Sequence, residues 1–435
     1  MAIHTIDSAS FDDAVEPGVS RRYAWVVFAL TFGLLLSDYM SRQVLNAVFP
    51  LLKAEWGLSD TQLGSLSSIV ALLVGLLTFP LSVVADRWGR VRSVTLMAAL
   101  WSVATLACAL AENYGEMFIA RFCVGVGEAA YGSVGIALIL SIFPPHLRST
   151  LTGAFMAGGA FGSVLGMATG GFIASRLGWR WAFGAMALFG AALVVLYFLS
   201  VTDKRVGSVR PTSGEAGGAP RGLRPLLAGL FSSRSVICAY VGSGLQLIVM
   251  SSVMAWMPSY LNRYYGMAPD RAGLTSALFV LIGAVGMVAC GMMTDAVSRR
   301  IAPRKWWMAI IYSMGTCVLL GTAFQLPTGN AQLIAIGLGM FVAAGTSGPA
   351  GAMVANLTPT AIHATAFATL TLANNLLGLA PGPFVTGFLA DRVSLQFALQ
   401  VIPFVPLLAA LAFIVGRRNY TADLGRLGKR PNGAA

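Results

Sequence analysis

The stretch Ser82-Val-Val-Ala-Asp86-Arg87-Trp-Gly89-Arg90-Val-Arg92 decides the fold, because a second version of it occurs in the other half of the chain. The later stretch reads Gly291-Met-Met-Thr-Asp295-Ala-Val-Ser-Arg299-Arg300. Each has a small residue, three intervening residues, an aspartate and then a basic cluster, and each follows a long apolar run. The chain therefore consists of two related halves, the construction used by a large class of membrane transporters whose halves rock about a central cavity.

Charged side chains in these two stretches lie where each apolar run meets water. An aspartate there can cap or pair with a neighbouring helix end, and the arginines can anchor at lipid headgroups. Such contacts change when the halves move. We therefore expect a role in conformational gating for Asp86, Arg87, Arg90, Asp295 and Arg299.

Composition identifies the chain as an integral membrane protein. Its 435 residues are 57% hydrophobic and only 11% charged, with a mean hydropathy of +0.75, whereas a soluble domain carries about 25% charged residues. The acidic stretch 1–19 has no apolar core and is not expected to be a cleaved signal peptide. The five cysteines all fall in apolar runs without metal-ligand spacing, so neither disulfides nor a zinc site is expected.

Hydrophobic runs predict an all-α fold of twelve transmembrane helices in two six-helix bundles around a central cavity. The first six runs are about 23–48, 61–85, 91–111, 114–142, 151–175 and 180–201, and the second six are about 235–260, 270–294, 305–325, 331–357, 361–389 and 394–415. The predicted domains are a tail over 1–22, a bundle over 23–202, a linker over 203–234, a bundle over 235–415 and a tail over 416–435. The linker is rich in Gly, Pro, Ser and basic residues, which is typical of a linker rather than a folded domain.

Basic residues predict the orientation of these helices. With both termini inside, 21 of the 29 Lys and Arg residues lie in inner segments, six lie in outer loops, and Arg42 and Arg121 lie within helices. This bias predicts that the termini and the linker lie on the cytoplasmic side, and we expect the membrane to be a bacterial inner membrane. The net charge of +12 thus reflects topology, and we expect no nucleic-acid partner.

Two charges in the fourth run mark a functional site. The segment Arg121-Phe-Cys-Val-Gly-Val-Gly-Glu128 lies inside a span, and seven residues put its end charges on one helix face roughly 10 Å apart. A charge in hydrocarbon costs at least a few kcal/mol, so such residues usually face a bundle interior or a wet cavity. The alternative to a functional role is a buried ion pair that only orients helices, and it is the weaker explanation because such pairs add little stability.

At this point the chain resembles the major facilitator superfamily over nearly its whole length, with the stretch from Ser82 to Arg92 in the place of that family's signature loop. The segments Asp38–Gln43, Gly57–Gly64 and Gly125–Tyr131 resemble the bacterial branch of spinster-type transporters. They also overlap the pattern of the anion:cation symporters, which carry sugar acids and other carboxylates.

In the symporters, an Asp-Arg pair on the first helix and an Arg and a Glu on the fourth handle proton and substrate. Arg42, Arg121 and Glu128 fit these positions, whereas Ser41 stands where the family has its aspartate. Asp38, one helical turn before Arg42 on the same face, offers a carboxylate instead. The resemblance thus implies substrate binding by Arg42 and Arg121 and proton coupling by Glu128, either with Asp38 or alone.

The second half offers polar rather than charged candidates. The run Gly378-Leu-Ala-Pro381-Gly382-Pro383 should break or bend its helix, and irregular backbone at membrane depth is tolerated where it is buried or lines a cavity. Just before it lie two asparagines, of which we expect one to face substrate. The full set of expected substrate contacts is Arg42, Arg121, Tyr39, Gln246, Asn374 and Asn375.

These observations predict a monomeric secondary transporter in contact with membrane lipids that carries a small organic anion, a carboxylate or sugar acid, by proton-coupled symport. No cofactor is expected, since the proton gradient supplies the driving force. A spinster-type exporter or flippase of a lipid or amphipath is the alternative, and it predicts a wide apolar cavity. An enzyme is not expected, because no metal cluster, nucleophile elbow or phosphate loop accompanies a span.

Overall fold

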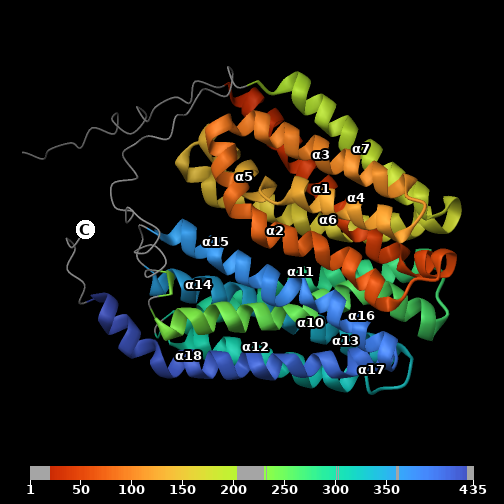
Figure 1. Ribbon diagram of the computed structural model, residues 1–435. Coiled ribbons are helices and arrows are strands. Elements are labelled where there is room, and N and C mark those ends of the chain that lie inside the picture. Colours follow the sequence, from red (N-terminus) through yellow and green to blue (C-terminus); the bar gives the residue numbers. More distant parts are fainter. Residues whose placement is uncertain are drawn as a thin grey trace, which may run out of the picture.

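The computed structural model describes residues 20–202, 230–231, 233–299, 301, 303–358 and 362–428, and these residues form helices and connections without a strand. Figure 1 shows the helices in two layers, the N-terminal bundle (α1–α7) above and the C-terminal bundle (α10–α18) below. The linker predicted at 203–234 and both predicted tails lie largely outside the described residues, so their boundaries stay predictions.

The N-terminal bundle contains α1 (Arg21–Trp56), α2 (Asp60–Trp88), α3 (Arg90–Leu110), α4 (Tyr114–Glu128), α5 (Tyr131–Ile142), the 3-10 turn η1 (Pro145–Leu147), α6 (Arg148–Leu177) and α7 (Trp179–Ser200). The C-terminal bundle contains α10 (Arg234–Tyr265), α11 (Pro269–Ser298), α12 (Arg304–Ala323), α13 (Asn330–Ala343), η2 (Ala344–Thr346), α14 (Ser347–Leu357), α15 (His363–Asn374), η4 (Asn375–Leu379), α16 (Pro381–Arg392), α17 (Leu395–Val401), η5 (Ile402–Phe404) and α18 (Val405–Gly428).

Among the described residues, 11 helical segments are long and apolar enough to cross a membrane. The one predicted span not among them, 361–389, is interrupted: α15 passes into the π-helical turn η4, and α16 begins at Pro381. The break expected from the run Gly378–Pro383 is therefore present. Because a π turn adds a residue to the helical repeat, it rotates the side chains that follow it.

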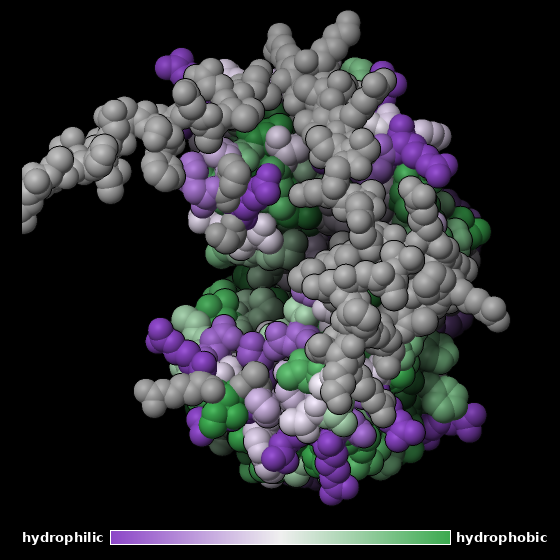
Figure 2. Space-filling view, turned by 90° about the vertical axis from the view of Figure 1, so that its left-hand side faces the viewer, coloured by the Kyte–Doolittle hydropathy of each residue, from purple (hydrophilic) through white to green (hydrophobic). Residues whose placement is uncertain are grey.

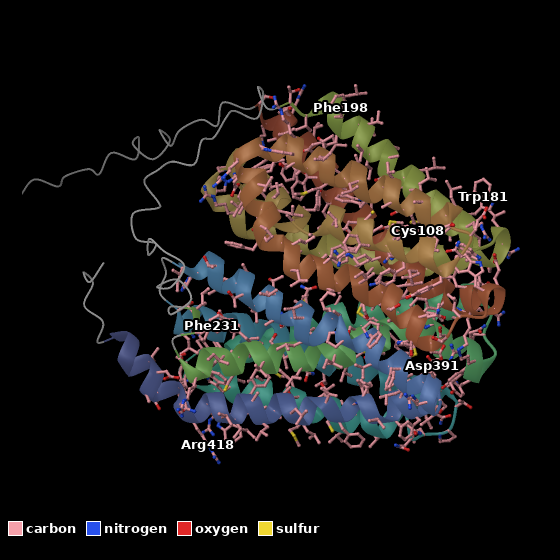
Figure 3. All side chains as sticks on the ribbon, viewed as in Figure 1. Cys108, Trp181, Phe198, Phe231, Asp391 and Arg418 are labelled. Atoms are coloured by element: carbon pink, nitrogen blue, oxygen red, sulfur yellow. The ribbon has the colours of Figure 1, made fainter. Side chains whose placement is uncertain are left out.

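Large apolar side chains cover the outer surface of both bundles. Trp181 is 60% exposed and Phe198 is 69% exposed, and both project away from α7, whereas Cys108 points into the bundle (Figure 3). Soluble monomeric proteins rarely expose apolar surface of this extent to water. Together with the apolar spans it makes the chain a multi-pass membrane protein.

Helix α6 packs closely against α1 through its glycines. A Cβ built on Gly166 would lie 2.5 Å from the carbonyl oxygen of Met40, and one on Gly170 would lie 2.5 Å from a methyl group of Val44. Near the end of α6, Gly171 and Gly273 of α11 face each other, so that α6 also contacts the C-terminal bundle. Small residues permit this approach of helix backbones.

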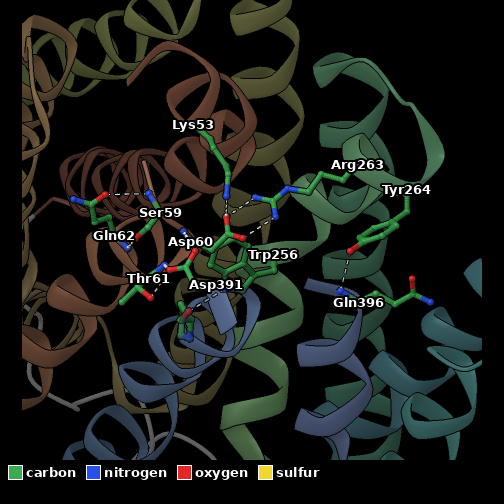
Figure 4. Close-up of polar contacts among 11 residues, drawn as sticks. Lys53, Ser59, Asp60, Thr61, Gln62, Trp256, Arg263, Tyr264, Asp391 and Gln396 are labelled. Carbon is green, nitrogen blue, oxygen red and sulfur yellow. Dashed lines mark hydrogen bonds and ion pairs between the residues drawn. The ribbon is translucent and has the colours of Figure 1, made fainter. Parts of the chain in front are cut away.

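The two bundles are tied together at one end of the molecule, here called the closed end. Arg263 of α10 holds both oxygens of Asp60 at 2.8 and 2.5 Å, and Lys53 of α1 lies 2.6 Å from the same carboxylate (Figure 4). The Asp60 side chain is only 4% exposed. A bidentate guanidinium–carboxylate pair of this kind is stronger and more directional than a simple ion pair.

Asp391, at the end of α16, strengthens the closed end by capping α2. Its oxygens accept hydrogen bonds from the backbone N–H groups of Asp60 and Thr61, both at 2.7 Å, and from the Thr61 hydroxyl at 2.6 Å. Burial raises the pKa of the Asp391 carboxyl, but these hydrogen bonds lower it further, so its pKa lies below the ordinary value. An ionised carboxylate at a helix N-terminus is favoured by the helix dipole.

The opposite end, here called the open end, carries the beginnings of α1 and α10. Figure 2 shows this end with a recess between the two bundles. Asp86 and Arg90 pair with each other at 3.4 Å within one helical turn, and the Arg90 side chain also donates to the Ala137 carbonyl of α5. Both contacts lie inside the N-terminal bundle, so this ion pair does not connect the bundles in this conformation.

The α1–α6 contact predicts that Gly166→Ala destabilises the protein. Its new methyl group must displace the backbone of Met40, and overpacking of this kind costs about 1–3 kcal/mol. The loss of stability is measured as a lower temperature of thermal unfolding of the purified protein in detergent, monitored by size-exclusion chromatography. The matched control is Gly153→Ala on the same helix, where a Cβ meets nothing within 4 Å. Equal melting of the two variants would contradict the packing described here.

The contact between Arg263 and Asp60 predicts that Arg263→Gln opens the closed end. Hydrogen bonds to charged groups contribute about 1.5–3 kcal/mol, so we expect the population open at this end to rise by tenfold or more. Electron-spin distance measurements between labels at Glu112 and Thr328, both exposed and on different bundles, detect the change. Arg271→Gln, which removes an exposed arginine of the same bundle, is the control. An unchanged distance distribution would show that this pair does not hold the end shut.

Candidate functional site

A cavity of about 340 Å³ lies between the two bundles. One wall is polar and comes mainly from α1, with Tyr39, Arg42, Gln43 and Asn46. The facing walls are largely apolar, and four methionines line them: Met156, Met250, Met254 and Met287. This volume is near the lower end of the range of about 300–1,000 Å³ for small-molecule sites.

Arg42 joins this cavity to two buried acids. Its Nε lies 2.5 Å from Oε2 of Glu128 and 3.5 Å from Oδ1 of Asp38. The Arg42 side chain is 21% exposed, whereas those of Glu128 and Asp38 are 0% and 4% exposed. The arginine thus presents one side to the cavity and the other to the two carboxyl groups.

Arg121 reaches the cavity from α4 but makes a different set of contacts. Its Nε donates to the Leu66 carbonyl of α2 at 3.5 Å and its Nη1 to the Ser41 carbonyl of α1 at 3.4 Å. It is 1% exposed. Among the described residues, the ion-pair partner of Glu128 is Arg42 and not Arg121. The set of Asp38, Arg42, Arg121 and Glu128 therefore contains two guanidinium groups and two carboxyl groups.

Tyr39 completes this group of predicted residues. Its ring lies 5.3 Å from the Arg42 guanidinium carbon, which is a cation–π distance. Gly159 of α6 packs against the same ring, and a Cβ built on this glycine would lie 3.0 Å from the Cε2 and Cζ atoms of Tyr39. The structure thus brings together Tyr39, Arg42 and Arg121 at the cavity, with Asp38 and Glu128 directly behind Arg42.

Three predicted substrate contacts lie away from the cavity lining in this conformation. Gln246 is fully buried and its amide donates to Thr316 and to the Ala343 carbonyl. Asn374 accepts a hydrogen bond from Ser243. Asn375 donates to the Thr371 carbonyl and packs against Gly75 of α2, at a contact between the bundles. Their role toward substrate stays a prediction.

Sequence reasoning did not single out two groups of residues that the structure makes prominent. Gln43 and Asn46 line the cavity beside Arg42. Asp60 and Arg263 are 203 positions apart and meet only in the folded protein. The capping box formed by Ser59 and Gln62 was a readable signal that a helix starts at Asp60, although it does not reveal the partner of that carboxylate.

No cluster of three His, Cys, Asp or Glu side chains with the geometry of a metal site occurs among the residues that the structure describes. The five cysteines are free thiols. The polar groups that line the cavity are two guanidinium groups, a phenol, two amides and several serine hydroxyls, and the carboxyl groups of Asp38 and Glu128 lie behind Arg42.

Comparison with known proteins agrees with this architecture. The chain is 26% identical over 417 residues to a protein called "Probable L-galactonate transporter" of Escherichia coli strain K12, covering 91% of this chain and 89% of that protein. It is 25% identical over 435 residues to "Protein spinster homolog 1" of Rattus norvegicus, covering 91% of this chain and 81% of the relative.

A solved structure has the same fold. The crystal structure of a bacterial homolog of the human lysosomal transporter Spinster, in an inward-facing and unoccupied conformation, superposes with a TM-score of 0.82 at 18% identity and covers 93% of this chain and 99% of that one. The family model of the Major Facilitator Superfamily matches residues 31–383. The relatives and the fold are those of transporters rather than enzymes, and the chain belongs to the Major Facilitator Superfamily.

Proposed function

We propose that this protein is a proton-coupled symporter of a small organic anion, a carboxylate of the sugar-acid type. The observation that carries the proposal is that Arg42 faces the cavity while it is ion-paired with two buried carboxyl groups. A guanidinium suits a carboxylate because its planar fork can bind both oxygens. The name of the L-galactonate relative supports the same substrate class.

Charge balance gives the coupling a physical cause. Two arginines and two ionised acids are neutral together, and a bound carboxylate adds a negative charge in a site of low dielectric. That charge competes with Glu128 and Asp38 for Arg42. Uptake of a proton by one of these acids restores neutrality, because a carboxyl group without a cation beside it resists ionisation in such a place. Anion and proton therefore bind together and leave together.

Alternating access follows from the two ends of the molecule. The basic residues of the chain favour an orientation in which the open end, with both termini, faces the cytoplasm. The closed end, with Asp60 and Arg263, then faces outward, and the conformation is inward-facing. The cavity would be exposed to the outside if the contacts at the closed end broke and the open end, where Asp86 and Asp295 lie, closed. We place the protein in a bacterial inner membrane as a monomer.

A spinster-type exporter of a lipid or amphipath is the second candidate. The four methionines of the cavity walls and the similarity to the spinster homolog favour it. Against it stands the volume of about 340 Å³, which suits a small solute better than a long acyl chain.

Glu128→Gln separates coupling from transport. The variant keeps the size of the side chain but cannot release or bind the coupling proton. We expect it to lose accumulation driven by a pH gradient at least tenfold while it keeps counterflow exchange of the same substrate. Proteoliposomes with the purified protein and a panel of carboxylates, sugar acids and lysolipids measure both.

The control is Glu112→Gln, which removes an exposed carboxylate in the turn before α4. Accumulation at the wild-type level by Glu128→Gln would refute the coupling role of this acid. If no carboxylate is transported while a lysolipid is, the amphipath exporter becomes the better hypothesis and the symporter is rejected.

A further inference from the structure

Four polar side chains form a stripe along α1 at the cavity. Tyr39, Arg42, Gln43 and Asn46 follow the spacing i, i+3, i+4 and i+7, which puts them on one helix face, and all four line the cavity. Arg42 and Tyr39 belong to the anion site proposed above. The amides of Gln43 and Asn46 have no part in charge balance and need a separate explanation.

The two amides form a pair that is incompletely satisfied. The Asn46 amide nitrogen donates to Oε1 of Gln43 at 2.8 Å. Asn46 is 4% exposed and Gln43 is 9% exposed, yet Oδ1 of Asn46 has no hydrogen-bond partner within the described part of the chain. A buried polar atom left in this way costs about 1–3 kcal/mol. That oxygen is closed to solvent in this conformation, whereas other atoms of both side chains line the cavity.

Much of the cavity wall around the pair is apolar. The walls facing α1 carry Met250, Met254 and Val280, which have no strong donor. The hydroxyls of Ser163 and Ser251, which also line the cavity, donate to backbone carbonyls of their own helices or of η4. A solute in the cavity is therefore a natural hydrogen-bond partner for the two amide side chains that line it.

We infer that the Gln43–Asn46 amide pair is the subsite that binds hydroxyl groups of the substrate, so that the cargo is a hydroxylated carboxylate. The inference rests on the proposed function, which places the carboxylate at Arg42. A primary amide offers donors and an acceptor, and a hydroxyl group does likewise, so the two are complementary. This holds whichever way each amide is turned.

The spacing along α1 fits a chain that carries its polar groups at intervals. From Arg42 to Asn46 the helix rises on the order of 6 Å, so the hydroxyls that the pair binds lie some carbons away from the carboxylate. An alkyl acid or an acyl chain in the same place would bury the amides without partners. The subsite thus selects against apolar acids as well as for hydroxylated ones.

An aldonate and an unsubstituted alkanoate of the same chain length test the inference. Binding to the full-length protein in lipid nanodiscs is measured by calorimetry. Each hydrogen bond contributes about 0.5–1.5 kcal/mol, up to roughly tenfold in affinity, so we expect the aldonate to bind the wild-type protein at least tenfold more tightly. Asn46→Leu and Gln43→Met, which keep side-chain size, should reduce this preference to about twofold by weakening the aldonate.

The control variant is Thr31→Val. Thr31 is buried on the same helix outside the cavity lining, and its hydroxyl bonds only to the Val27 carbonyl within α1. This variant should keep the wild-type preference.

Equal affinity of the wild-type protein for the two acids would overturn the inference without the need for any variant. So would an undiminished preference in folded Asn46→Leu and Gln43→Met. In both results a carboxylate still binds and the proposed function stands. If neither acid binds while a lysolipid does, the proposed function itself fails, and the subsite with it.

Discussion

The rest of the site depends on Arg42. Its guanidinium pairs with two buried acids, Glu128 and Asp38, and also faces the cavity. Arg42 is the cation in both ion pairs seen for Asp38 and Glu128 in the described residues. Buried charges of this kind are tolerated when they are paired, and removal of one partner leaves an uncompensated charge. Anything that draws Arg42 toward the cavity therefore changes the charge that the acids can hold. In the proposed mechanism, binding of the anion and protonation of an acid are therefore coupled electrostatically through Arg42.

The fold holds α1 in place by close packing against α6. In the proposed mechanism, the two bundles separate at one end at a time. Glycines of α6 lock that helix onto α1 along much of its length, so the polar stripe from Tyr39 to Asn46 keeps its geometry. The other side of the cavity comes mainly from the second bundle. In this conformation the bidentate pair of Asp60 and Arg263 and the capping of α2 by Asp391 close one end. Strong directional contacts at the closed end and largely apolar walls around the cavity suit a rocking motion of the two bundles.

The sequence predicts the helices well because hydrocarbon permits few alternatives: long apolar runs must become helices, and charges inside them must find partners. The same argument located Arg42, Arg121 and Glu128 and the break before Pro383. It could not tell that Glu128 pairs with Arg42 rather than with Arg121 on its own helix, because the pairing depends on how α1 and α4 pack. For Asn374 and Asn375, the π turn that starts at Asn375 alters the register, so the helical period no longer tells which one faces inward. Contacts between the bundles belong to one conformational state, and no sequence pattern states which end is closed.

Proton uptake on substrate binding tests the central claim most directly. Calorimetric titration of a transported carboxylate into the wild-type protein in nanodiscs, repeated in buffers of different ionisation enthalpy, measures the protons taken up per anion bound; protein-free nanodiscs serve as the blank. If Arg42 is shared as described, the apparent enthalpy varies with the buffer and its slope corresponds to net uptake of a proton approaching one per carboxylate. An enthalpy that is the same in every buffer would mean that the anion binds without protonation of Asp38 or Glu128, which would contradict the account.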